Sequence, residues 1–378
     1  MSLVSSVEAG RVVLYRQDDG EWTTNNVFSG MQPGESHRYS AKVQEDETHY
    51  ESNEWTNLIA TDQRPVEEKN VALKVQNGKL TVTVHEEGVF QYATEEQASA
   101  FGSSNEFTLE SGTKHVYVYV RRAPDYDKGV EPSAYISLSL SISGDERVVY
   151  KNYSFSADPQ AEWEENGKYK YFNCTFLQGV QSTKKGVDVT FENCVFYAAK
   201  QNGVQACVAL TSVQSVILYG GTYYGTASAE KGDVVYGILL NLYNTTDANI
   251  SISNNTFALQ AQDGKTAVAI AVATRLGSTD QPTDAWATDA TAGTVKDGTI
   301  ELKENKVADG CDCANILLGV APQGKDTEAN TSTGDFYLVF RGNGSEFLVF
   351  ENYRFAKGKT VTPKQVAAGD EKTFGKGR

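Results

Sequence analysis

Phe191-Glu192-Asn193-Cys194-Val195-Phe196 and Ile252-Ser253-Asn254-Asn255-Thr256-Phe257 are two copies of one sequence pattern. Two apolar residues alternate with variable ones, an Asn follows two positions later, and another apolar residue comes three positions after the Asn. This alternation predicts a short strand with one buried face, followed by a bend. The seven copies are Val148-Tyr150-Asn152-Phe155, Tyr169-Tyr171-Asn173-Phe176, Val189-Phe191-Asn193-Phe196, Val216-Leu218-Gly220-Tyr223, Ile250-Ile252-Asn254-Phe257, Ile300-Leu302-Glu304-Val307 and Leu348-Phe350-Asn352-Phe355.

The spacing of the copies predicts a solenoid. They begin between 20 and 50 residues apart, so the unit has a minimum length near twenty residues and grows by insertion. Short repeats that each contain a strand are typical of solenoids. In a parallel β-helix, equivalent residues of successive coils lie about 4.8 Å apart, and their inward side chains stack into one core. A second apolar stretch follows several copies and predicts at least two strands per coil; these stretches are residues 206–210, 236–240, 267–272 and 316–320.

The Asn of the pattern has an expected structural role. At a sharp bend, its amide can bond to the amides of the coils above and below and to the backbone of the turn. We therefore expect a ladder of equivalent side chains, formed by Asn152, Asn173, Asn193, Asn254 and Asn352.

This pattern resembles that of the right-handed parallel β-helices of the pectate-lyase-like superfamily, above all in the segments 191–196 and 252–257. The resemblance covers about residues 148–356. It implies a fold more than a function, because the superfamily includes polysaccharide lyases and hydrolases, phage tailspikes and appendages, and bacterial adhesins. The paired-Asp strand and the Gly-His-Gly and Arg-x-Lys segments of pectin hydrolases are absent from the sequence.

The region before the repeat favours antiparallel strands. Apolar residues alternate with polar ones over residues 71–75, 80–84, 116–120 and 136–140. Asn77-Gly78 separates the first two runs and predicts a hairpin turn, since both residues tolerate positive φ angles. We therefore expect an all-β chain with an antiparallel β-sandwich-like domain at residues 1–144 and a right-handed parallel β-helix at residues 145–356.

The last segment, residues 357–378, is expected to be an extended tail. Its Lys and Gly content leaves little apolar area to offset the conformational entropy lost on ordering. This composition predicts a tether that is held by a neighbouring subunit.

Composition excludes several classes of protein. The 378 residues contain 49 Asp and Glu against 34 Lys and Arg, which gives a net charge of −15. Nucleic-acid binding requires clustered basic residues, so we exclude it. No apolar run reaches the roughly 20 residues that span a bilayer, and Met1 to Gly10 do not resemble a secretory signal. Either the protein acts where it is made or a signal has been removed.

The search for catalytic and metal-binding residues predicts no site of either kind and no cofactor. His37, His49, His85 and His115 all precede the repeat, and no catalytic role is expected for them. His85 and His115 lie at strand ends and are expected to be ordinary surface or rim histidines. The carboxylates that could form an acid pair or a Ca²⁺ site are expected to be solvated turn residues. They are Asp263, Asp309 and Asp312.

Two features stay open at this level. Cys174 and Cys194 follow the Asn of successive copies, so their stacking permits either a disulfide or two free thiols. Trp286 lies in a Thr- and Asp-rich insertion at residues 276–298. As a candidate contact residue it either stacks on a sugar or protein partner or packs back onto the repeat.

Two classes of function fit these observations. The first is a non-enzymatic structural or interaction protein of a virion, such as a phage capsid decoration or tail appendage, or of a cell-surface assembly. Its partners would be other protein subunits, with homo-oligomers expected, and its location would be the virion or the cell exterior. The alternative is a carbohydrate-active or carbohydrate-binding protein whose partner is a surface glycan.

Overall fold

The structure is a computed structural model of an all-β chain that divides into two compact units. The first unit comprises Met1–Val71, Thr81–Phe107 and Thr113–Ser141, and the second comprises Ala72–Leu80, Thr108–Gly112 and Ile142–Arg378. The division therefore differs from a single cut after residue 144. The structure describes residues 7, 10–142, 146–159, 163–201, 203–231, 234–241, 245–262, 264–273, 295–311, 315–319, 333–341, 349–351, 354–355, 359–360 and 372–374.

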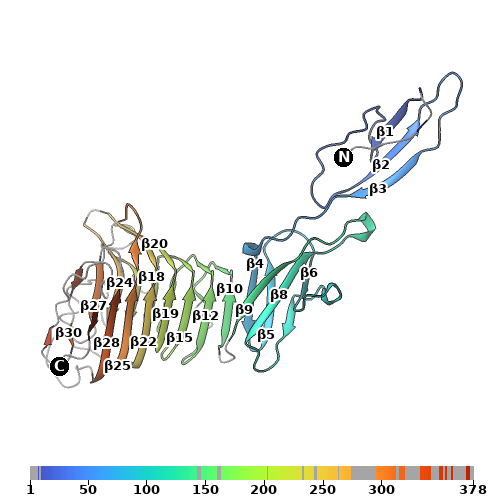
Figure 1. Cartoon of the computed structure of the whole chain (residues 1–378). Helices are drawn as coiled ribbons and strands as arrows, with labels where there is room; N and C mark the ends of the chain where they lie inside the picture. The colour runs from blue at the N-terminus through green and yellow to red at the C-terminus, as the bar shows by residue number, and fades with distance from the viewer. Residues whose placement is uncertain are drawn as a thin grey trace. The chain divides into compact units, whose positions relative to one another are not determined.

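The first unit contains two antiparallel three-stranded sheets (Figure 1). In one, β2 (Ser36–Val43) pairs with β1 (Val13–Gln17) and β3 (Trp55–Ala60) around buried Tyr15 and Tyr39. In the other, β8 (His115–Arg122) pairs with β6 (Phe90–Ala93) and β9 (Ile136–Ser141). Alternate residues of β8 and β9 are buried, as their sequence pattern predicts.

The hairpin predicted at Asn77-Gly78 is confirmed. Asn77 has φ 53° and Gly78 has φ 71°, so both turn residues adopt the left-handed conformation that a tight hairpin requires. The turn joins β4 (Val71–Gln76) to β5 (Lys79–Val84). These two strands do not form a sheet with β8, because they continue the largest sheet of the second unit, which ends at β7 (Glu106–Thr108).

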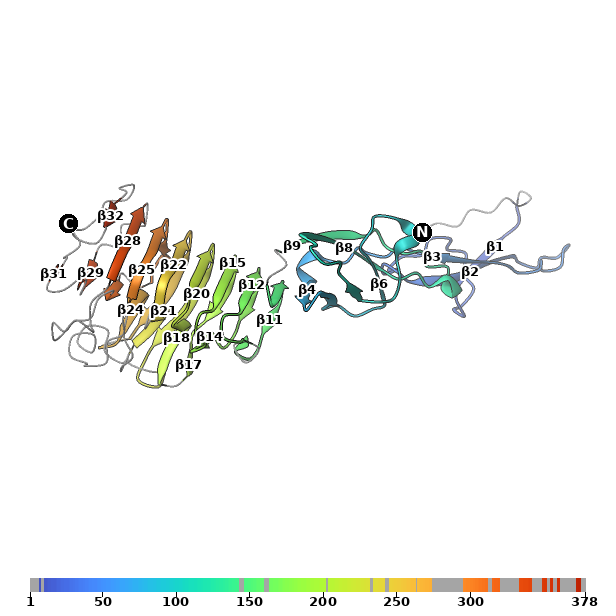
Figure 2. The ribbon, with the colours of Figure 1, turned by 90° about the horizontal axis from the view of Figure 1, so that it is seen from below.

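Three sheets of parallel strands form most of the second unit (Figure 2). The 11-stranded sheet contains β10 (Val148–Lys151), β12 (Lys168–Phe172), β15 (Asp188–Glu192), β19 (Ser215–Tyr219), β22 (Thr245–Ser253), β25 (Val295–Lys303), β28 (Thr333–Arg341) and β32 (Lys372–Phe374). The 6-stranded sheet contains β11 (Ser154–Phe155), β13 (Thr175–Phe176), β16 (Val195–Tyr197), β20 (Thr222–Ala227), β23 (Thr256–Ala261) and β26 (Lys306–Val307). The 7-stranded sheet contains β14 (Val180–Ser182), β18 (Val204–Thr211), β21 (Val234–Asn241), β24 (Thr266–Ala273), β27 (Asn315–Gly319) and β29 (Val349–Glu351), with β17 (Ala199–Gln201) beside β18.

The first six copies of the sequence pattern lie in register. Tyr150, Tyr171, Phe191, Leu218, Ile252 and Leu302 are successive partners in the 11-stranded sheet. The last apolar residue of each copy forms a second column in the 6-stranded sheet, where neighbouring rings stack at centroid distances of 4.8–5.0 Å. The rings of this column belong to Phe155, Phe176, Phe196, Tyr223 and Phe257.

The seventh copy was assigned to the wrong strand. Phe350 lies in β29, which pairs with β27 in the 7-stranded sheet, opposite Ile316. The place in register with Ile300 and Leu302 is taken by Leu338 and Phe340 of β28. Asn352, which the sequence placed in the ladder, lies outside the described residues.

Antiparallel strands flank the parallel part of the 11-stranded sheet at both ends. β4 pairs with β10, with Gln76 opposite Val148, and β32 pairs with β28, with Phe374 opposite Leu338. The prediction that the C-terminal segment needs a neighbouring subunit for order is therefore wrong for Lys372–Phe374, whose backbone pairs within its own chain. The free edge of β28 supplies the hydrogen-bonding groups that composition alone did not reveal. A further short pair joins β30 (Arg354–Phe355) to β31 (Lys359–Thr360).

Candidate functional site

The Asn of the repeat adopts a left-handed backbone conformation at every described copy. Asn152, Asn173, Asn193 and Asn254 have φ between 51° and 59°. Gly220 and Glu304, which replace Asn in two copies, have φ 67° and 52°. Asn and Gly adopt this conformation at lower energetic cost than other residues. The bend thus selects these residue types through the backbone.

A buried amide ladder lies one residue further along the chain than the bend Asn. The side chains of Asn173, Asn193 and Asn254 are exposed, whereas Asn255 and Asn305 are completely buried. Asn255 Nδ2 donates to Asn305 Oδ1 at 3.0 Å and to Leu218 O at 2.9 Å. Asn255 Oδ1 accepts a hydrogen bond from Gly221 N at 2.8 Å. The C-terminal neighbours of two bend residues thus form buried amide contacts between copies.

Cysteine thiols occupy the same position in earlier copies. Cys194 Sγ donates to Tyr171 O at 3.4 Å, and Asn305 Nδ2 donates to Ile252 O at 2.9 Å. Both acceptors belong to the same column of the 11-stranded sheet. Cys174 and Cys194 are free and buried, which resolves the open alternative in favour of thiols. Burial, together with the adjacent Cys174 thiol, raises the pKa of Cys194 far above its ordinary range, so the thiol keeps its proton.

A second series of bends was missed in the sequence. Asn166, Gly186 and Ser212 all have positive φ. Their backbone N–H groups donate to Lys185 O, Ser212 O and Asn241 O of the following copies. The signal was a small or polar residue two or three positions before β12, β15 and β19, but it varies among Asn, Gly and Ser.

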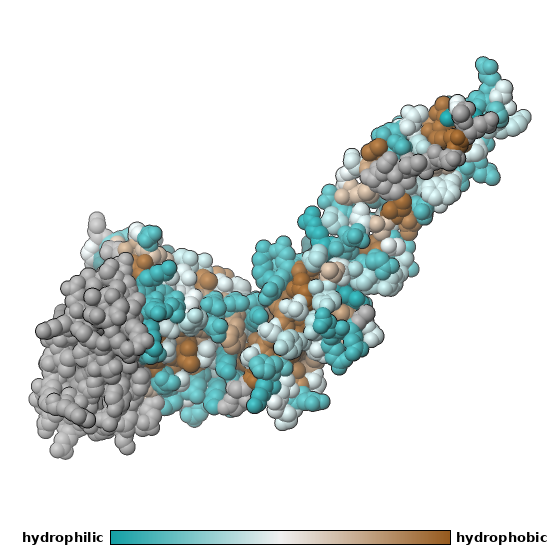
Figure 3. Space-filling view, viewed as in Figure 1, coloured by the Kyte–Doolittle hydropathy of each residue, from teal (hydrophilic) through white to brown (hydrophobic). Residues whose placement is uncertain are grey.

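Large exposed side chains gather on the outer faces of three successive copies in the second unit. Leu177, Tyr197 and Tyr224 are 44 %, 42 % and 40 % exposed, and they follow the buried residues of the aromatic column in the 6-stranded sheet. Ile217 and Tyr219 are exposed on β19 of the 11-stranded sheet. On the face drawn in Figure 3, hydrophobic residues form small patches between hydrophilic ones. These side chains are available for contact with a ligand or partner.

The β3 strand is a second accessible surface. It lies at the edge of its sheet, and its first four residues are exposed. Trp55 is 55 % exposed and Leu58 is 46 % exposed. An edge strand that presents apolar side chains is a template for pairing with another chain.

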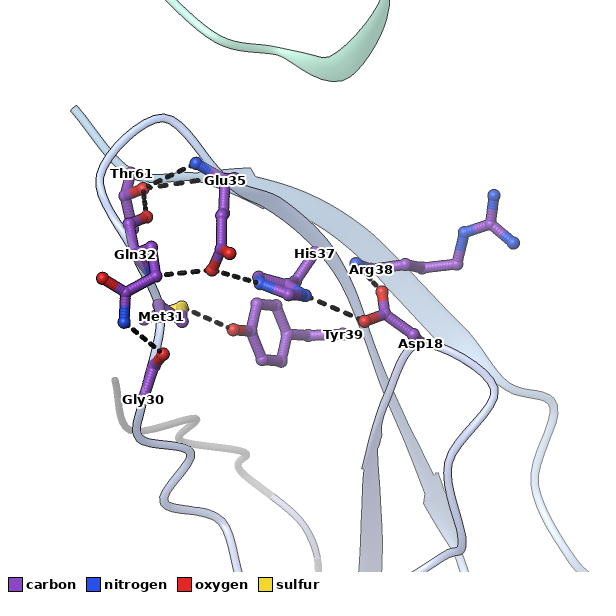
Figure 4. Close-up of polar contacts among 9 residues, drawn as sticks. All are labelled: Asp18, Gly30, Met31, Gln32, Glu35, His37, Arg38, Tyr39 and Thr61. Atoms are coloured by element: carbon purple, nitrogen blue, oxygen red, sulfur yellow. Dashed lines mark hydrogen bonds and ion pairs between the residues drawn. The ribbon is translucent and has the colours of Figure 1, made fainter. Parts of the chain in front are cut away.

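His37 forms a polar cluster with two carboxylates in the first unit (Figure 4). Its Nδ1 lies 2.8 Å from Asp18 Oδ2, and its Nε2 lies 3.3 Å from Glu35 Oε2. Carboxylate oxygens only accept hydrogen bonds, so an imidazolium with two N–H groups fits this geometry. Asp18 Oδ1 also accepts Arg38 N, and Glu35 Oε2 accepts Gln32 N. The cluster therefore connects the segments before and along β2 with the end of β1.

In this cluster the charged imidazole and the two charged carboxylates stabilise one another. The hydrogen bond that His37 donates to Asp18, followed by the one that it donates to Glu35, raises the pKa of His37, and partial burial opposes this increase. The hydrogen bond from His37 lowers the pKa of Asp18, and the backbone N–H of Gln32 followed by His37 lowers the pKa of Glu35. The sequence alone did not indicate this role of His37. Its paired carboxylates come from positions 18 and 35, which no local motif connects.

The remaining candidates from the sequence do not form a common site. Asp309 is exposed, while Trp286, Asp263 and Asp312 lie outside the described residues. His85 and His115 are exposed, as expected, and His49 is exposed as well. Within the described ranges, no group of three His, Cys, Asp or Glu side chains is arranged to hold a metal ion.

A shallow pocket in the first unit is lined by residues including Gln63, Arg122 and Tyr126. Arg122 forms an ion pair with Glu86 and donates to Glu87 O and Arg64 O. Its guanidinium is therefore occupied by contacts within the chain. Gln63 Nε2 likewise donates to Ala123 O at 2.7 Å and to Glu131 O at 2.9 Å. The polar side chains of this lining therefore link neighbouring segments of the first unit and have a structural role.

The fold and these surfaces define the chain as an all-β protein with parallel repeat sheets. In the part of the chain that the structure describes, no helix is long and apolar enough to cross a membrane. No family model, curated protein or solved structure matches the chain.

Proposed function

We propose that this chain is a non-enzymatic structural or interaction protein, a subunit of a virion or of a cell-surface assembly. Its second unit would be a right-handed parallel β-helix, and its N-terminal strands would form a sandwich-like domain. The register of six sequence copies across parallel sheets supports the β-helix. Right-handedness follows from the strong preference of parallel crossover connections.

The exposed edge of β3 is the observation that best supports a role in assembly. β3 is paired on one side only, and its side chains Trp55 and Leu58 are exposed on opposite faces of the sheet. A strand of another copy that pairs with β3 would satisfy the open edge and bury these side chains. The partner we propose is therefore a second protein subunit, in the simplest case a second copy of this chain.

Light scattering over a concentration series tests this proposal. We expect the wild-type chain to self-associate, and we expect Trp55→Lys and Leu58→Lys to weaken association without changing the circular-dichroism spectrum. Tyr117→Lys is the matched control, because Tyr117 is exposed on the central strand β8. A chain that remains monomeric throughout, or equal association of all three variants, would contradict the proposal.

The enzymatic alternative has its own readout. The chain is incubated with neutral and acidic polysaccharides, and the products are separated by size. We expect no shortening of any polysaccharide. Depolymerisation would overturn the non-enzymatic assignment, whatever the oligomeric state.

A further inference from the structure

Tyr197 and Tyr224 form an exposed stack that runs across the strands of the 6-stranded sheet. Their ring centroids lie 5.2 Å apart with planes inclined by 19°. The two residues are direct partners between β16 and β20. This distance is close to the spacing of neighbouring strands, about 4.8 Å, so the ring faces point along the direction in which the repeat advances.

One ring face of this stack has a small neighbour. On the first side, Leu177 follows Phe176, the partner of Phe196, so Leu177 lies beside Tyr197. On the other side, the partner of Tyr224 is Ala258 in β23. Ala308 comes next, because Val307 is the partner of Phe257 and Ala308 N donates to Phe257 O. The second face of Tyr224 therefore looks onto two successive methyl side chains, across a width of about two strand spacings.

The other outward positions of β20 and β23 beside Tyr224 and Ala258 are polar. Thr222 and Thr226 flank Tyr224 on β20, and Thr256 and Gln260 flank Ala258 on β23. These four side chains are uncharged and carry hydrogen-bond donors and acceptors. Lys306 is the nearest cation by register, since it is the partner of Thr256.

We propose that the free face of Tyr224, above Ala258 and Ala308, binds a neutral pyranose ring of a glycan. The aliphatic C–H face of such a sugar can pack on the tyrosine ring, while its hydroxyl groups exchange hydrogen bonds with the Thr and Gln side chains. Ala258 is essential to this geometry, because a larger side chain would occupy the sugar's place. The chain's net charge of −15 disfavours acidic glycans. This site goes beyond the proposed assembly function and does not use β3.

Saturation-transfer NMR and calorimetric titration test the site in the full chain. The probes are neutral oligosaccharides of glucose, mannose and galactose, with an oligogalacturonate as the acidic arm. We expect at least one neutral oligosaccharide to bind. Tyr224→Ala, which removes the stacking face, and Ala258→Leu, which places a larger side chain beside that face, should each weaken that binding roughly tenfold.

Tyr219→Ala is the matched control. Tyr219 is 43 % exposed in the same unit but lies on the 11-stranded sheet, so its removal should leave binding unchanged. The proposal is overturned if no neutral oligosaccharide binds, if binding survives in both site variants, or if only the oligogalacturonate binds. Self-association through β3 is measured separately, so either proposal can fail while the other stands.

Discussion

At the scale of single residues, the bend of the repeat uses two neighbouring positions for two different physical purposes. The first position needs a residue that tolerates positive φ, and Asn193 with φ 53° illustrates it. The second position needs a small or polar side chain that can lie inside the unit, and Asn255 illustrates it with no exposed surface. Where two Asn residues follow each other, as at 254 and 255, only the second is part of the buried ladder.

Substitution at Asn193 should reveal a backbone requirement. Asn193→Leu should lower the free energy of unfolding by about 1–2 kcal/mol, because a side chain without the local hydrogen bonding of Asn is strained at positive φ. Asn193→Gly should change it by less than about 1 kcal/mol, since Gly adopts this conformation freely. Urea denaturation of both variants provides the measurement. Equal destabilisation by Gly and Leu would indicate that the amide itself is needed.

Substitution at Asn255 should reveal a hydrogen-bonding requirement. Asn255→Leu leaves Gly221 N and Leu218 O without their side-chain partners. We expect a loss of about 1–3 kcal/mol for each buried group that stays unpaired. Thermal and urea unfolding measure the effect, with Gln260→Leu as an exposed control on β23. A loss no larger than that of the control would exclude the ladder as a source of stability.

The protonation of His37 should depend on Asp18. An NMR titration of the imidazole signals should give His37 a pKa above its ordinary value of 6.5. Asp18→Asn should bring that pKa down, because the variant removes the leading cause of the increase. Asp19→Asn changes a neighbouring carboxyl group that is not among the His37 contacts, and it should have little effect. An unchanged His37 pKa in Asp18→Asn would contradict the cluster.

The same cluster sets a direction for stability against pH. A raised pKa of His37 stabilises the fold fully below pH 6.5, and this contribution disappears as the pH rises through the raised value. The lowered pKa values of Asp18 and Glu35 stabilise the fold above their ordinary values of 3.8 and 4.5, respectively, and this contribution disappears on acidification. The difference in melting temperature between wild type and His37→Gln should therefore be greatest between about pH 4.5 and 6.5.

At the scale of elements, inner and outer residues of one strand divide stability and recognition between them. In β16, Phe196 is completely buried between Phe176 and Tyr223, with centroid distances of 4.9 Å to both. Its neighbour Tyr197 is 42 % exposed and stacks on Tyr224. Period-two alternation thus gives each short strand a core face and a contact face.

Alanine substitutions in β16 should separate these two roles. Phe196→Ala should lower the free energy of unfolding by about 3–5 kcal/mol, because it leaves a cavity within a continuous aromatic column. Tyr197→Ala should lower it by only about 0.5–1.5 kcal/mol, through loss of one exposed stacking partner. Denaturant unfolding of the two variants is the measurement, and similar losses would contradict the assigned burial.

Sequence periodicity predicted those elements whose side chains alternate regularly. Six copies and the Asn77-Gly78 hairpin follow from local patterns. The seventh was misplaced because Leu348-Phe350-Asn352 fits the pattern better than Leu338-Phe340-Gly342, although β28 extends the sheet. A strand's partner depends on insertion lengths and on all three sheets together, which a local pattern does not contain. The His37 cluster was missed for the same reason, since its carboxylates meet only after β1 and β2 pair.

At the scale of the whole molecule, the chain passes back and forth between the two units. The chain leaves the first unit to form residues 72–80 of the second, returns, and crosses again at residues 108–112. The sequence alone predicted one N-terminal domain that contains all of these segments. Pairing of β4 with β10 makes part of this region a component of the larger sheet.

Truncation should show the consequence of this shared sheet. A chain that begins at residue 145 lacks β4 and exposes the edge of β10, so we expect it to aggregate or unfold at lower temperature. A chain that begins at residue 62 keeps β4 and should retain the parallel sheets. Size-exclusion chromatography and circular dichroism compare the two. A monodisperse fragment 145–378 with unchanged melting temperature would show that β4 is dispensable.

The antiparallel strands β4 and β32 bound the run of parallel strands in the 11-stranded sheet on its two sides. Each of them runs opposite to its parallel neighbour, so a further copy added beyond it would not continue the parallel run. The parallel run can then change its length by gain or loss of a whole copy between β4 and β32. Each such step would shift the distance between them by about 4.8 Å. Proteins built on this plan could therefore differ in the length of the parallel run by whole strand spacings, while the strands at both ends stay the same.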